Sequence, residues 1–165
     1  MGSLKLSGAT SGHVEIAAPA VAGTQTVEFP TDVVQKSELE WTAYTPTWTA
    51  SGGSPSVGNG ALEGEYIRVG ELCHLRVRLT IGSTTSTAGN SWLFSLPELS
   101  VGAAAGSVAI YDASASVQSG TAHIQSGSAL VFAHVQGTGV VGVTSPITWV
   151  TGDYLQISIT YKVAA

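Results

Sequence analysis

The feature of this sequence that most restricts its fold is an alternation of apolar and polar residues with a period of two. Between Asp153 and Val163, every second residue from Leu155 onward is apolar or aromatic, and the residues between them are polar. Residues 72–81 repeat this pattern. Successive side chains of a β-strand point to opposite faces, so each stretch predicts a strand with one face in a core. Helical periodicity is almost absent, and we predict an all-β protein.

Further candidate strands follow one another between turn signals rich in Gly, Ser and Asn. They cover residues 42–49, 63–69, 91–96, 107–111, 121–125, 129–135 and 147–150. From Trp41 onward this gives roughly nine or ten strands at a spacing of about 8–12 residues, which is typical of antiparallel β-sandwiches and jelly rolls. We therefore predict a jelly-roll β-sandwich domain over residues 41–165.

Residues 1–40 are predicted to form a separate N-terminal β-ribbon arm and connector. The arm contains three very short alternating pieces, at residues 4–6, 13–16 and 25–29. Each piece is too short to bury much apolar surface alone, so the ribbon needs either the main domain or other chains to cover it, and we favour other chains. Residues 31–40 are the only helix-like segment, with Asp32 as the candidate N-cap of at most about two turns.

Composition and charge exclude several classes of function. Six Lys and Arg against eleven Asp and Glu give a net charge of −5 with no basic cluster, so nucleic acid is not an expected partner. Cys73 is the only cysteine, which excludes an intrachain disulfide and a thiolate metal site. We find no long apolar run and no leader-like N-terminus, and we expect neither a membrane anchor nor a signal peptide.

One predicted strand, residues 129–135, is apolar on both faces. A strand of this kind must be covered on both sides, whereas a monomeric sandwich covers only the inner face of each sheet. The second cover is therefore predicted to be another copy of the chain. The candidate interface residues are Leu130, Phe132 and His134 on this strand and Val14, Ile16, Val27 and Phe29 in the arm.

The sequence carries no catalytic or cofactor-binding motif, and we expect no enzyme, no cofactor and no metal. No two of the four histidines fall two or four residues apart; they are His13, His74, His123 and His134. A metal site would have to combine several strands or a symmetry axis. Glu63 and Glu65 are two residues apart and project from the same face of a strand, and paired carboxylates can act as acid and base on a glycosidic bond. Nearby opposite charges favour ion pairing on a wet sheet face instead.

Aromatic side chains are the strongest candidates for ligand binding, because Trp and Tyr rings can stack on sugars. Trp41, Tyr44 and Trp48 cluster in the sequence and form the candidate glycan-stacking group. On an extended chain Trp41 faces away from the other two. Each of the three can equally fill a core or a subunit interface.

Residues 6–30 resemble a segment of fibre and appendage proteins from tailed bacteriophages, with its Ser-Gly, Ala-Pro and Ala-Gly-Thr elements and its closing Pro30. Residues 44–49, 58–66, 92–97 and 148–155 are similar to blocks in small tail and capsid-surface proteins, particularly of phages of actinobacteria. The resemblance implies a virion structural protein, commonly a trimer of jelly-roll or tumour-necrosis-factor-like sandwiches whose N-terminal ribbons wind among the three chains. It transfers no catalytic residue.

The leading hypothesis is therefore a homotrimeric component of the virion surface, made in the host cytoplasm. It would be a capsid decoration protein or a short fibre that reinforces or decorates the particle, seated on a major capsid or tail protein through residues 1–40. The alternative is a receptor-binding tail fibre module that recognises a host cell-surface glycan. A glycan depolymerase is the third hypothesis, and the scattered acidic residues give it little support.

Overall fold

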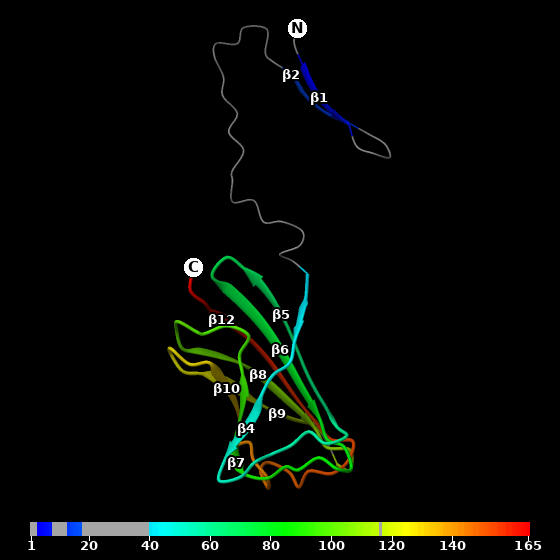
Figure 1. The fold of residues 1–165 in the computed structure, drawn as a ribbon, viewed down its shortest axis with the longest axis vertical. Coiled ribbons are helices and arrows are strands. Elements are labelled where there is room, and N and C mark those ends of the chain that lie inside the picture. Colours follow the sequence, from blue (N-terminus) through cyan, green and yellow to red (C-terminus); the bar gives the residue numbers. More distant parts are fainter. Residues whose placement is uncertain (1–2, 8–12, 18–39, 116) are drawn as a thin grey trace. The chain divides into compact units, whose positions relative to one another are not determined.

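The computed structural model describes residues 3–7, 13–17, 40–115 and 117–165. The chain divides into two compact units, residues 1–33 and residues 34–165, and Figure 1 traces both. The described residues form twelve β-strands and no helix, which confirms the all-β prediction. Nothing in this described part is a helix long and apolar enough to cross a membrane.

The N-terminal unit contains a two-stranded antiparallel ribbon of β1 (Ser3–Ser7) and β2 (His13–Ala17). Its register pairs Leu4 with Ile16 and Leu6 with Val14. Two of the three predicted short strands are therefore present and pair with each other. The third, at residues 25–29, and residues 31–39 of the helix-like segment lie outside the described residues.

The second unit is built around one antiparallel sheet of ten strands, which Figure 1 shows curling on itself. In spatial order its strands are β3 (Thr42–Tyr44), β5 (Ala61–Val69), β6 (Leu72–Thr80), β12 (Tyr154–Lys162), β8 (Ala104–Tyr111), β9 (Val117–Ile124), β10 (Leu130–Val135), β7 (Asn90–Ser95) and β4 (Trp48–Ser51). The short β11 (Gly139–Val140) pairs with β10 beside this path. This curled antiparallel sheet is consistent with the predicted β-sandwich.

One segment of chain connects the two edges of the curled sheet. Strand β3 pairs with β5 at one edge, and β4, which follows three residues later, pairs with β7 at the other. Between them the Ser95 amide donates to the Thr47 carbonyl, and the Thr47 amide donates to the Ser95 hydroxyl. Pro46 lies at the crossover, where a missing N–H removes no ladder bond. The predicted strand at 42–49 is thus divided between two edges, and the sheet encloses one core.

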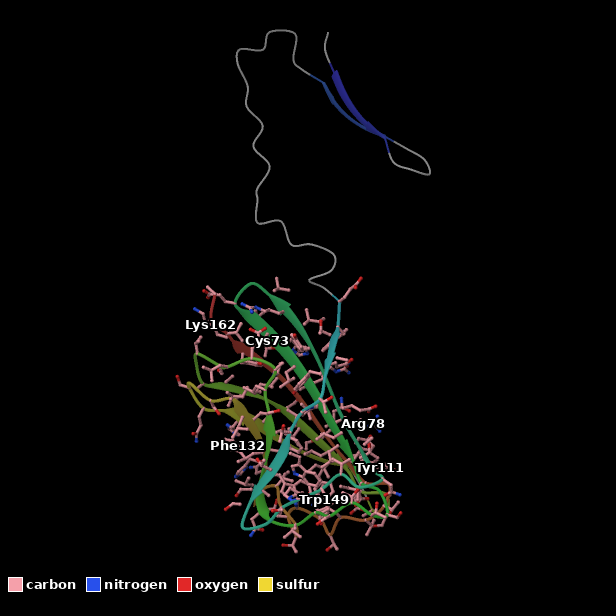
Figure 2. All side chains as sticks on the ribbon, viewed as in Figure 1. Cys73, Arg78, Tyr111, Phe132, Trp149 and Lys162 are labelled. Carbon is pink, nitrogen blue, oxygen red and sulfur yellow. The ribbon has the colours of Figure 1, made fainter. Side chains whose placement is uncertain are left out.

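The core follows the alternation of the strands. Leu155, Ile157 and Ile159 of β12 are buried, and β6 contributes Leu75 and Leu79 from directly paired positions. An aromatic cluster occupies one end, where the ring centroid of Trp92 lies 4.8 Å from those of both Trp48 and Trp149. Figure 2 shows Trp149 at this end and Cys73 toward the other.

The strand predicted at residues 147–150 is wrong, because this stretch is irregular. Its alternate residues Ile147 and Trp149 are nevertheless buried. The Trp149 indole donates to the Gly142 carbonyl, and the Val150 amide donates to the carboxylate of buried Asp153. The Asp153 carboxylate therefore accepts a backbone hydrogen bond that a neighbouring strand would otherwise accept. Alternate residues are buried here although the segment pairs with no strand of the described residues.

A buried thiol and phenol predict that the protein loses stability in alkali. Cys73 and Tyr161 are 0% and 2% exposed, and burial raises the pKa of both groups above their ordinary values. The folded chain keeps these protons at pH values where the unfolded chain releases them. The contribution of these protons to the free energy of unfolding is thus complete below about pH 8. Above that pH it falls as Cys73 ionises in the unfolded chain, and above about pH 10 Tyr161 adds to the loss, by up to about 1.4 kcal/mol per pH unit for each group.

Urea denaturation between about pH 8 and 11 measures this dependence. Tyr161→Phe keeps the ring and removes the titrating hydroxyl, which donates to the Glu98 carbonyl. The variant is expected to start less stable at pH 8 by about 1 kcal/mol and to show a shallower decline. A wild-type free energy of unfolding that stays constant across the range would contradict the prediction.

Candidate functional site

Strand β10 carries two different faces, as the doubly apolar pattern predicts. Val131, Ala133 and Val135 are buried in the core, whereas the alternate residues point away from it and are half-buried. The three candidate interface residues Leu130, Phe132 and His134 are these outward residues. The structure therefore brings them together on one surface, outside the core of the chain.

Neighbouring strands extend this surface. Phe132 pairs with His123 of β9 on one side and with Leu93 of β7 on the other. The rings of Phe132 and His123 stack with centroids 5.3 Å apart, and His134 meets His123 edge-on at 6.3 Å. We call the five residues Leu93, His123, Leu130, Phe132 and His134 the β10 outer face. No sequence pattern predicted Leu93 and His123 at this surface, because their positions depend on the register between strands that are distant along the chain.

The chemistry of the β10 outer face is that of a contact surface. The outward positions of β7, β9 and β10 include no Lys, Arg, Asp or Glu. Protein interfaces are depleted of charged residues and enriched in aromatic ones at their centres. Packing another protein surface on these half-buried apolar side chains would remove their remaining apolar area from water, which is favourable.

The candidate interface residues of the arm belong to the other unit. Val14 and Ile16 lie in β2, at positions paired with Leu6 and Leu4 of β1. Val27 and Phe29 lie outside the described residues. The interface role of all seven candidates stays a prediction.

The three aromatic residues predicted to stack on a glycan do not form a common platform. Trp48 is only 7% exposed and packs against Trp92 and Phe94, so its ring is not accessible to a sugar. Tyr44 is half-buried: its hydroxyl donates to the Ser95 carbonyl, and its ring covers Gly64, where a Cβ would overlap it. Trp41, at 40% exposure, is the only exposed member of the three.

A polar groove lies on the outward side of β5, β6 and β12. It has a volume of about 580 Å³ and is lined by Ala43, Tyr44, Thr45, Leu62, Glu63, Gly64, Glu65, Arg76, Val77, Arg78 and Gln156. The strand register places Glu63 across from Arg78 and Glu65 across from Arg76. Arg76 Nη1 lies 3.0 Å from Glu65 Oε1, which is the ion pair expected on a wet sheet face.

Arg78 is held differently from Arg76. Its guanidinium carbon lies 4.3 Å from the ring centroid of Tyr154, and this ring stacks on Tyr111 at 5.1 Å. The three residues come from β6, β12 and β8, and Figure 2 shows Arg78 and Tyr111 near the same edge, away from Phe132. Sequence reasoning missed this stack because it joins three strands that are distant along the chain.

Metal-ligating residues are not grouped in the part of the chain that the structure describes. No three His, Cys, Asp or Glu side chains there lie close enough to hold an ion. Nδ1 of His74 lies 2.7 Å from the Thr160 hydroxyl, and His123 and His134 flank Phe132.

Comparison with known proteins gives one informative likeness. In an alignment of 134 residues that covers 78% of this chain, the identity is 28% to a Haemophilus influenzae protein described as the Mu-like prophage FluMu defective tail fiber protein. The match covers 22% of that relative, so the chain spans about a fifth of its length. No family model matches the chain. No solved structure matches it either.

Proposed function

We propose that this chain is a structural component of a bacteriophage virion, located on the surface of the particle. The observation that carries the proposal is the likeness to a prophage tail fibre protein over most of the chain. The all-β fold supports it, because antiparallel sheets joined by short turns suit rigid particle-surface proteins. The role is mechanical: the protein decorates or reinforces the particle as a short fibre or as a decoration protein.

The working form in this proposal is a homotrimer of jelly-roll subunits. The β10 outer face supports self-association, because it presents Phe132 and two leucines, and the outward positions of β7, β9 and β10 carry no Lys, Arg, Asp or Glu. Obligate interfaces bury more than about 2,000 Å², which is more than five residues can supply. The N-terminal ribbons would provide the remaining area and would also attach the trimer to a capsid or tail protein.

Receptor binding is a second candidate function, and one observation favours it. The groove on β5, β6 and β12 combines polar hydrogen-bonding groups with aromatic rings, as sugar-binding surfaces do. Decoration and receptor binding are compatible in one molecule, since they use different strands of the outward side of the sheet: β7, β9 and β10 for one, and β5, β6 and β12 for the other.

Mass spectrometry of purified particles tests the structural role. Particles from a lysate of the phage or induced prophage that encodes the chain are banded in a density gradient and washed in high salt. The chain is expected to remain in the particle band with the major capsid protein, in a copy number divisible by three. Recovery of the chain only among the soluble proteins, from a gradient that contains intact particles, would overturn the proposal.

A further inference from the structure

We propose that the groove on β5, β6 and β12 is a carbohydrate-binding site. Arg78, Glu63 and Gln156 are its hydrogen-bonding residues, and Trp41 and the Tyr154–Tyr111 stack are its aromatic borders. The inference rests on the second candidate function and gives it a location. Of the three aromatic residues expected from the sequence, Trp41 borders the groove and Tyr44 lines it, whereas Trp48 is buried in the core.

The side chain of Arg78 supports the proposal first. Glu63 is its paired position on β5, yet no carboxylate among the described residues forms an ion pair with it, whereas Arg76 is paired with Glu65. The Tyr154 ring instead holds the guanidinium by a cation–π contact at 4.3 Å. The guanidinium N–H groups of Arg78 are therefore held in place, and no acceptor among the described residues forms an ion pair with them. A guanidinium held in this way can donate two parallel hydrogen bonds to two neighbouring oxygens of a ligand.

The order of hydrogen-bonding groups across the groove also supports a sugar ligand. Glu63, Arg78 and Gln156 form one row on three adjacent strands, because Arg78 pairs with Glu63 on one side and with Gln156 on the other. Adjacent strands lie about 4.8 Å apart, so the row spans about 10 Å. It offers carboxylate acceptors, guanidinium donors and an amide that does both. Neighbouring hydroxyls of a sugar ring need such a mixture of donors and acceptors.

Exposed aromatic rings border the groove on two sides. Trp41 and Tyr111 are 40% and 39% exposed, and each ring is packed by neighbours. Trp41 is flanked by the Arg76 guanidinium at 5.2 Å and by the edge of His74 at 5.6 Å. Tyr111 lies flat on Tyr154. Rings that are already ordered lose little conformational freedom when the apolar face of a sugar packs on them.

The charges of the groove narrow the class of ligand. Glu63 and Glu65 balance Arg76 and Arg78, so the lining has no net charge. Two carboxylates repel phosphate and sulfate groups, and four charged side chains make the groove unsuitable for an apolar ligand. The ligand that fits is a neutral oligosaccharide or one with an isolated acidic sugar.

The test uses the full chain on an array of immobilised neutral and uronic-acid-containing oligosaccharides, with the dissociation constant of retained sugars measured in solution. The wild type is expected to bind a subset of sugars. Arg78→Ala and Gln156→Ala are each expected to weaken binding at least about tenfold. Lys162→Ala is the matched control, because it removes an exposed charge on β12 outside the groove and should leave affinity unchanged.

Circular dichroism confirms that each variant is folded, and Gln156→Ala keeps the test decisive if Arg78→Ala unfolds. No retention of the wild type on any sugar would overturn the inference, and so would unchanged binding in folded groove variants. These failures are distinguishable from failure of the structural role, which the particle band measures separately. A chain that remains on particles but binds no sugar would be a structural component without this site.

Discussion

Replacing Phe132 with aspartate is expected to reduce the mass of the protein in solution from about 50 kDa, three times the 16.8 kDa of one chain, to that of a single chain. Phe132 lies at the centre of the β10 outer face, between His123 and Leu93. A trimer with this face inside would bury three carboxylates without partners, and each burial would cost several kcal/mol. Size-exclusion chromatography with light scattering measures the change.

The fold itself should survive this substitution, because the side chain lies outside the core and is already half-exposed. Thr160→Asp is the matched control: it places the same charge on the exposed side of β12, away from the β10 outer face. The control is expected to keep the three-chain mass. A Phe132→Asp variant that is folded and still trimeric would show that this face is not the interface.

Trp92→Ala is expected to lower the free energy of unfolding by about 3–5 kcal/mol. Trp92 is 0% exposed and lies between Trp48 and Trp149, with its indole N–H donating to the Gly89 carbonyl. Truncation leaves a large cavity at the end of the core that these three rings fill. Urea denaturation followed by circular dichroism at one fixed protein concentration measures the loss, since association also contributes to stability.

Trp41→Ala is the matched control for Trp92→Ala, because it removes the same ring from a position that is 40% exposed. It is expected to change stability by less than about 1 kcal/mol. Similar losses in the two variants would contradict the division of the tryptophans into a core group and an exposed one.

The sequence predicted the strands well because a period of two is a local property. Residues 72–80 and 154–162 form β6 and β12 with the expected alternate residues in the core. The same local signal failed at residues 147–150, where Asp153 satisfies a backbone amide and alternate burial needs no strand. Alternation also does not show which face of a strand is covered. For this reason the sequence does not distinguish a surface position for Trp48 from the core position that it occupies.

The spatial order of the strands could not be predicted from the sequence. This order determines which residues meet on the β10 outer face and in the groove on β5, β6 and β12. The doubly apolar pattern identified Leu130, Phe132 and His134, but not the residues that register brings beside them. In the groove, Glu63 and Arg78 face each other across the hairpin of β5 and β6. This pairing joins neighbouring segments of the sequence. Tyr111 and Tyr154 lie more than thirty residues beyond Arg78 in the sequence, so no local pattern predicts that their rings stack.

The central claim is that copies of this chain assemble on a virion around a threefold axis, with the β10 outer face turned toward the neighbouring copies. A cryo-EM map of the intact particle, at a resolution that shows the strands, tests it most directly. The account predicts three sheets around one axis with β10 inside the assembly and the groove on β5, β6 and β12 open to solvent. Single copies on the particle, or trimers with β10 facing solvent, would contradict it.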